Sequence, residues 1–302
     1  MTTAATERTS SPPQRATRLR GLLGACRPKQ WLKNVLVLAA PAAAGVLDQP
    51  DSLLATAIAF LAFCLAASGT YLVNDARDAA ADRLHPRKRH RPVAAGTISP
   101  TLAYVAGGCC LVGGLAVSML TGRWQLTAIV LAYVILTTAY SLHLKRVPIL
   151  DLISVAGGFV LRAAAGAVAV AVPMSSWFLI VATLGSLFMV AGKREAELAN
   201  GERGESRATL RLYSKEFLWY VRATSSGALL VSYCLWAFEH EGLARLAFGI
   251  SIVPFAVGIL RYAMLVDTGF GEEPEEVVLS DSMLLLSGLA LVACIAVGVY
   301  VV

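Results

Sequence analysis

The chain has 302 residues, of which 57% are hydrophobic and only 15% are charged. A soluble domain is normally about one quarter charged, so this composition excludes a soluble globular protein. The formal net charge of +6 does not indicate a nucleic-acid partner, because the chain has no soluble basic domain to bind one.

The amino-terminal residues 1–20 are rich in Thr, Ser, Pro and Arg, and we expect them to form a disordered cytoplasmic tail. They are not a signal peptide, because no short apolar core with a cleavage site follows them. Residues 21–302 are therefore expected to form a single transmembrane domain.

Repeated apolar runs of roughly 20 residues follow, which is the length that a helix needs to cross a bilayer. They are too long and continuous for the alternating strands of a membrane barrel. The sequence thus predicts an all-α polytopic membrane bundle with about nine transmembrane helices. The expected spans are 31–47, 53–73, 100–121, 124–143, 149–172, 176–192, 217–238, 246–266 and 282–302.

Lysine and arginine are distributed unevenly between alternate loops. They are frequent in the amino-terminal segment and in loops 74–99, 144–148 and 193–216, whereas the intervening loops contain only Arg123 and Arg245. Basic loops stay on the cytoplasmic side, so we expect a multi-pass plasma-membrane protein with its N-terminus inside and, after nine spans, its C-terminus outside. Because the outer loops are short, this arrangement favours chemistry on a cytosolic substrate.

The first polar cluster follows the second expected span directly. Asn74, Asp78 and Asp82 are spaced i, i+4, i+8 and would line one face of a helix, with Asp75 on its flank. Mg²⁺ prefers oxygen ligands and usually takes one or two carboxylates together with substrate phosphates. The spacing predicts that these four side chains hold Mg²⁺ and a diphosphate; a solvated helix end with scattered acids is the alternative.

Basic residues follow these acids in the same loop. Some of them serve to keep the loop inside, but we expect two or three to contact substrate phosphate and the rest to face lipid headgroups. The candidates are Arg83, Arg87, Lys88 and Arg91. Lys29 and Lys33, spaced i, i+4 at the start of the first span, could equally meet headgroups or substrate.

Arg162 lies about halfway along the expected span 149–172, among small residues. An arginine at that depth is costly and normally faces the bundle interior with a partner. Asp151 precedes it by about three helical turns, so both side chains could point into one cavity. A buried structural ion pair is the alternative.

Further substrate contacts are expected at the ends of other spans. Lys193, Arg194 and Glu197 begin the loop after the sixth span, although Lys193 and Glu197 could simply pair with each other. Tyr71 and Tyr140 could donate hydrogen bonds to phosphate, with a membrane-interface belt as the simpler role. Lys145, in the loop 144–148, is a further candidate for a substrate contact.

The N-D-x-x-D-x-x-x-D element at 74–82 resembles the first motif of the UbiA superfamily of intramembrane transferases. The resemblance implies a nine-helix bundle whose aspartate-rich loops bind a magnesium–diphosphate donor. One feature departs from the pattern of the prenyl-transferring members: loop 193–216 contains no aspartate.

Five motifs resemble a narrower family, the actinobacterial decaprenyl-phosphate phosphoribosyltransferases. They are R-P-K-Q-W-x-K-N at 27–34, Y-L-V-N-D at 71–75, H-P-x-K-R-x-R-P at 85–92, L-R-A-x-A-G at 161–166 and G-K-R-x-A-E-L at 192–198. The resemblance implies Mg²⁺-dependent transfer of 5-phosphoribose from 5-phosphoribosyl 1-diphosphate to decaprenyl phosphate, an early step towards the lipid donor of cell-wall arabinan. Asp75, Asp78 and Arg162 are the expected catalytic residues, and the sequence leaves a homo-oligomer open.

Two other functions stay open at this point. A prenyltransferase that moves a polyprenyl chain onto a small acceptor would share the fold and the first motif, but the missing second aspartate cluster argues against it. A lipid-phosphate carrier or flippase would need charged or polar residues that continue through several spans to the outer face. The expected spans contain few such residues apart from Arg162 and Arg261.

Overall fold

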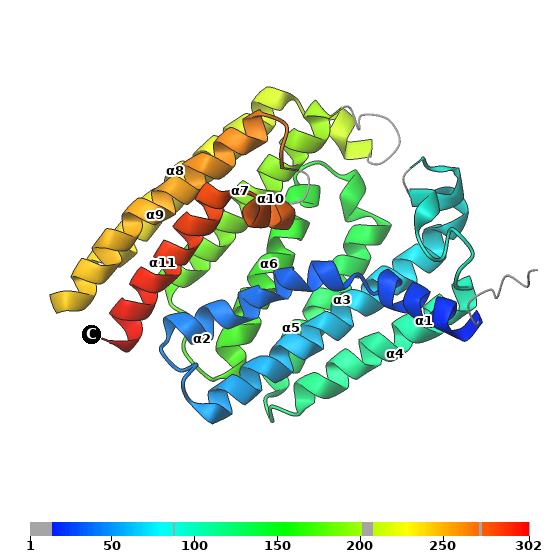
Figure 1. Cartoon of the computed structure of the whole chain (residues 1–302), viewed down its shortest axis with the longest axis horizontal. Helices are drawn as coiled ribbons and strands as arrows, with labels where there is room; N and C mark the ends of the chain where they lie inside the picture. The colour runs from blue at the N-terminus through cyan, green and yellow to red at the C-terminus, as the bar shows by residue number, and fades with distance from the viewer. Residues whose placement is uncertain (1–13, 87, 201–207, 272–273, 302) are drawn as a thin grey trace, which may run out of the picture.

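The computed structural model describes residues 14–86, 88–200, 208–271 and 274–301. Within these ranges the regular elements are all helices, as predicted (Figure 1). They are α1 (Gln14–Ala25), η1 (Pro28–Leu38), α2 (Ala39–Ala43), α3 (Pro50–Leu84), η2 (Lys88–His90), α4 (Pro100–Met119), α5 (Trp124–Leu142), η3 (Leu144–Arg146), α6 (Leu150–Ala169), α7 (Ser176–Ala199), η4 (Ala208–Arg211), α8 (Lys215–Phe238), α9 (Gly242–Asp267), α10 (Pro274–Ser280) and α11 (Ser282–Tyr300).

Seven of the described helices are long and apolar enough to cross a membrane: α3, α4, α5, α6, α7, α9 and α11. The expected count of nine is therefore not confirmed. Helix α8 has the necessary length, with 24 residues, but Arg222 and the polar run 224–226 lower its hydropathy. The apolar outer faces of these helices are what a bilayer would cover.

The expected first span, 31–47, is not one transmembrane helix. It forms the 3₁₀ helix η1 and the five-residue helix α2, and Gly45 then turns the chain with a φ of 68°. Element η1 lies directly on α6, where a Cβ added at Gly166 would come within 1.9 Å of the Val37 carbonyl oxygen. The small residue at this position is what lets the two backbones approach each other.

Helices α3 and α6 form the centre of the bundle. In each, about half of the apolar window is buried, 50% and 56%, against 17–22% in the other five candidate spans. Figure 1 shows α4 on one side of this centre and α8 and α9 on the other. Helix α3 is 35 residues long and extends well past the expected end at residue 73, so the polar face at 74–82 is carried on a rigid helix.

Part of the segment expected to be a disordered tail, residues 14–20, is helical in the structure. Helix α1 already begins at Gln14, and its Leu22 and Ala25 pack against an apolar cluster formed with Leu72 and Ile98. This apolar contact stabilises a segment whose composition alone favours disorder. Residues 1–13 lie outside the described residues.

Candidate functional site

A cavity of about 360 Å³ opens where the C-terminal parts of α3 and α5 meet η1 and the first half of α6. Its lining is unusually rich in charge for a helical bundle. Two carboxylates, Asp78 and Asp82, face it. The cations that face it are Arg27, Lys33, Lys88, Arg91, Lys145 and Arg162.

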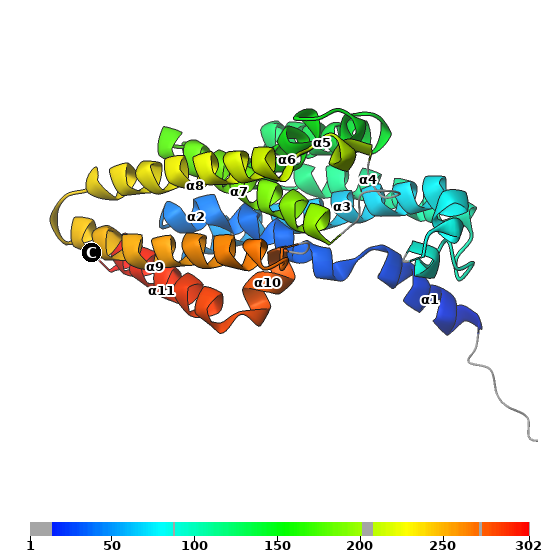
Figure 2. The same cartoon turned by 90° about the horizontal axis from the view of Figure 1, so that it is seen from above.

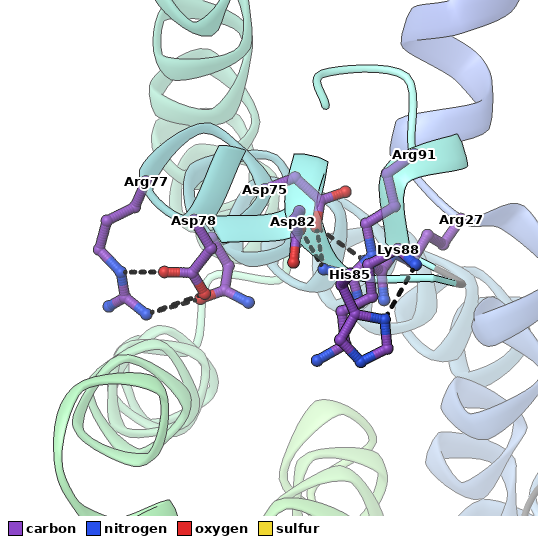
Figure 3. Close-up of polar contacts among 9 residues, drawn as sticks. Arg27, Asp75, Arg77, Asp78, Asp82, His85, Lys88 and Arg91 are labelled. Atoms are coloured by element: carbon purple, nitrogen blue, oxygen red, sulfur yellow. Dashed lines mark hydrogen bonds and ion pairs between the residues drawn. The ribbon is translucent and has the colours of Figure 1, made fainter. Parts of the chain in front are cut away.

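The predicted acidic face of α3 forms one wall of this cavity. Asn74, Asp78 and Asp82 all line it, as their i, i+4, i+8 spacing requires. Arg77 joins the first two, with its Nη2 3.0 Å from Asn74 Oδ1 and its Nε 2.9 Å from Asp78 Oδ1 (Figure 3). The same oxygens that would bind a divalent metal thus already hold a cationic group.

Asp75 does not line the cavity with these three residues. It is buried, and its Oδ1 accepts hydrogen bonds from Arg27 Nη2 at 2.8 Å and Arg91 Nη1 at 3.1 Å. Arg91 also donates to Asp82 Oδ2 at 2.8 Å. Asp75 therefore binds two arginines of the lining without lining the cavity itself. Asp82, which does line the cavity, accepts a hydrogen bond from one of them, Arg91 (Figure 3).

Arg162 is buried at the inner end of the cavity, and its partners are neutral. Its guanidinium donates to Asn34 Oδ1 at 2.7 Å, to the Gly158 carbonyl at 2.8 Å and to the Tyr133 hydroxyl at 2.8 Å. Among the described residues no carboxylate pairs with it, so the alternative of an ion pair with Asp151 is wrong. The positive charge of Arg162 therefore stays without a carboxylate partner among the described residues, at a position that lines the cavity.

Asp151 pairs with Arg194 instead. Arg194 Nε lies 2.7 Å from Asp151 Oδ2, and its Nη1 lies 2.9 Å from Glu197 Oε2. The Arg194 side chain is 0% exposed and does not line the cavity, in contrast to the substrate contact expected for it. Tyr140 does line the cavity and donates to Asp151 Oδ1 at 2.9 Å, so this buried network reaches the site through the tyrosine.

The other residues expected to contact substrate differ in where the structure places them. Tyr71 and Lys145 line the cavity as predicted, with the Arg27 guanidinium 4.7 Å from the centre of the Tyr71 ring. Lys193 lies beside the network, with its Nζ 3.8 Å from Glu197 Oε1. Arg87 lies outside the described residues.

Lys29 and Arg83 are placed away from the cavity. The Lys29 side chain is 89% exposed and lies 3.5 Å from Glu276. Arg83 donates to the Ala94 carbonyl at 3.3 Å and lines a separate hollow of about 250 Å³ together with Arg18.

The sequence reasoning missed Arg27 and Asn34 as members of the site, and it did not distinguish Lys33 from Lys29. All four residues belong to the motif at 27–34, but the α-helical spacing expected there does not apply. Three residues complete a turn of a 3₁₀ helix, so Lys29 and Lys33 point in different directions, and only Lys33 faces the cavity.

Comparison with known proteins identifies the family. A model of the UbiA prenyltransferase family matches residues 35–288. The chain belongs to this family. The fold agrees with it: a solved UbiA homolog from Archaeoglobus fulgidus, described as bound to DMAPP and Mg²⁺, covers 92% of this chain and 97% of its own with a TM-score of 0.72 and 18% identity.

Two curated relatives match almost end to end. The decaprenyl-phosphate phosphoribosyltransferase of Corynebacterium glutamicum is 45% identical over 93% of this chain and 87% of its own. The enzyme of the same name from Mycolicibacterium smegmatis is 43% identical over 97% of this chain and 96% of its own.

Proposed function

We propose that this chain transfers 5-phosphoribose from 5-phosphoribosyl 1-diphosphate to decaprenyl phosphate and releases diphosphate. The observation that carries the proposal is the charge of the cavity, where six cations face two carboxylates. The donor carries a diphosphate and a 5-phosphate, and the acceptor adds a further phosphate. Such a set of anions needs many cations and few carboxylates. The two curated relatives that match most of the chain are named for this transfer.

Asn74, Asp78 and Asp82 suit a magnesium ion that is shared with the diphosphate. No group of three His, Cys, Asp or Glu side chains in the described part of the chain could hold a metal ion alone. Two carboxylates and one amide oxygen, completed by substrate phosphate oxygens, match the coordination that Mg²⁺ prefers. When bound, the ion would neutralise charge on the departing diphosphate.

The reaction exchanges one C–O bond for another at the anomeric carbon of the ribose. The bond to diphosphate breaks, and an oxygen of the lipid phosphate forms the new bond. That oxygen is ionised at neutral pH, so the chain needs to supply no general base. Lys33, Lys88 and Lys145 would hold the donor phosphates, and Arg162 would stabilise negative charge at the inner end of the cavity.

We also propose that the cavity opens to the cytoplasm of a plasma-membrane protein. The loops rich in lysine and arginine, 74–99 and 144–148, adjoin the cavity, which is where the positive-inside rule puts the cytoplasm. The lipid acceptor would enter from the bilayer, and the water-soluble donor from the cytosol.

Purified protein in lipid vesicles tests the function directly. We expect label from radioactive 5-phosphoribosyl 1-diphosphate to enter polyprenyl phosphate in the presence of Mg²⁺. A parallel reaction offers radioactive polyprenyl diphosphate and an aromatic acid. If labelled product forms only in this second reaction, the proposal is refuted and the protein is a prenyltransferase.

A further inference from the structure

Helix α10 brings two acids from the C-terminal part of the chain onto η1. Figures 1 and 2 both show this short helix near the blue segment that precedes α2, which is η1. Glu276 lies 3.5 Å from Lys29, and Glu275 lies 3.1 Å from Lys33. The two pairs come from the same pair of elements, but they differ sharply in their surroundings.

The Lys33–Glu275 pair is largely buried, with side-chain exposures of 21% and 11%, whereas the Lys29–Glu276 pair is 89% and 59% exposed. Lys33 lines the cavity, and Glu275 lies behind it, outside the cavity lining. Lys33 Nζ also donates to Gln30 Oε1 at 2.5 Å. Its ammonium is thus fixed by two oxygens on the side away from the cavity.

Glu275 carries its charge at neutral pH. Burial raises its pKa, but Lys33 and Lys193 act in the opposite direction and bring the pKa below the usual value for a glutamate. The carboxylate is therefore a permanent counter-charge that lies near two basic residues of the site. An exposed pair such as Lys29–Glu276 contributes little, because water screens it.

We infer that Glu275 is a positioning residue, which holds the Lys33 ammonium in the direction where it meets a phosphate of the sugar donor. The inference rests on the proposed function and extends the site to an element that the family motifs do not include. A lysine side chain loses much rotamer freedom when it is fixed. Glu275 imposes that order before the donor arrives, so the donor binds a lysine that is already oriented.

The test compares Glu275→Gln with Glu276→Gln, a matched control one residue away on the same helix. We expect Glu275→Gln to raise the KM for 5-phosphoribosyl 1-diphosphate about tenfold, with a much smaller effect on kcat. Glu276→Gln should keep both constants within about twofold. Equal effects of the two substitutions, or an unchanged donor KM in Glu275→Gln, would overturn the inference.

A double-mutant cycle separates positioning from general stability. If Glu275 acts through Lys33, adding Glu275→Gln to Lys33→Gln should not raise the donor KM further. Additive effects would show that Glu275 acts by another route. If the wild-type protein transfers no phosphoribose, the proposed function fails and this inference falls with it; an active wild type with an insensitive Glu275 refutes the inference alone.

Discussion

At the scale of single residues, Arg162 distinguishes this site from an ordinary polar defect in a helix bundle. A guanidinium at this depth is expensive, and burying it with a carboxylate is the usual remedy. Here the guanidinium donates hydrogen bonds to an amide oxygen, a hydroxyl and a backbone carbonyl, and none of these acceptors cancels the charge. The protein keeps a buried cation whose natural partner is an anion in the cavity.

Replacing this charge should remove catalysis without unfolding the protein. We expect Arg162→Gln to lower turnover by about 100-fold or more, the cost typical for losing one donor to a developing negative charge. Its melting temperature should change little, since an uncompensated buried charge is also removed. Arg261→Gln, which breaks a pair with Asp281 away from the cavity, is the control and should stay active. Wild-type turnover in Arg162→Gln would contradict the assignment.

The acidic face makes a separate prediction about metal dependence. Asp78→Asn removes one of the two carboxylates that line the cavity in the described part of the chain, so we expect the Mg²⁺ concentration for half-maximal turnover to rise about tenfold. Asp51→Asn, in the first turn of the same helix, is the control and should leave that concentration unchanged. Turnover of Asp78→Asn at ordinary Mg²⁺ levels would show that the metal is held elsewhere.

At the scale of elements, the sequence predicts helix faces well where the backbone is α-helical. The spacing of Asn74, Asp78 and Asp82 gave their common orientation, because α3 continues without a break. The 3₁₀ geometry of η1 has no clear sequence signal, so the sequence does not separate Lys33, which faces the cavity, from Lys29, which does not. The burial of Arg194 depends on Asp151, a residue 43 positions away, and no local pattern reveals such a pairing.

The close contact of η1 with α6 leads to a prediction for Gly166. A methyl group there would overlap the Val37 carbonyl, so Gly166→Ala must displace η1, which carries Lys33 and Asn34. We expect a lower melting temperature in detergent and a loss of most activity. Gly108→Ala, where an added Cβ meets nothing within 4 Å, should be neutral or slightly stabilising, since alanine favours a helix by about 1 kcal/mol. Equal behaviour of the two variants would argue against the contact.

At the scale of the whole molecule, the chain separates a charged end rich in lysine and arginine from an end where these residues are few. The cavity, the basic loops and α10 lie at the first end. The C-terminus lies at the other, where the Tyr300 hydroxyl donates to the Ala42 carbonyl at 3.3 Å, next to the turn at Gly45. Helix α11 connects the two ends, because it starts next to α10 and finishes at this contact. We therefore expect the two ends to lie on opposite sides of the bilayer.

This arrangement predicts the outcome of reporter fusions. A fluorescent protein fused after residue 270, between α9 and α10, should be bright, because that point lies at the charged end expected in the cytoplasm. Fused after residue 302 it should be dark, whereas alkaline phosphatase at the same position should be active. The second result also decides whether the number of crossings is odd or even, since only an odd number brings the C-terminus outside when the N-terminus is inside. Fluorescence at the C-terminus would place residues 270 and 302 on the same side of the membrane and would contradict the opposite placement of the two ends.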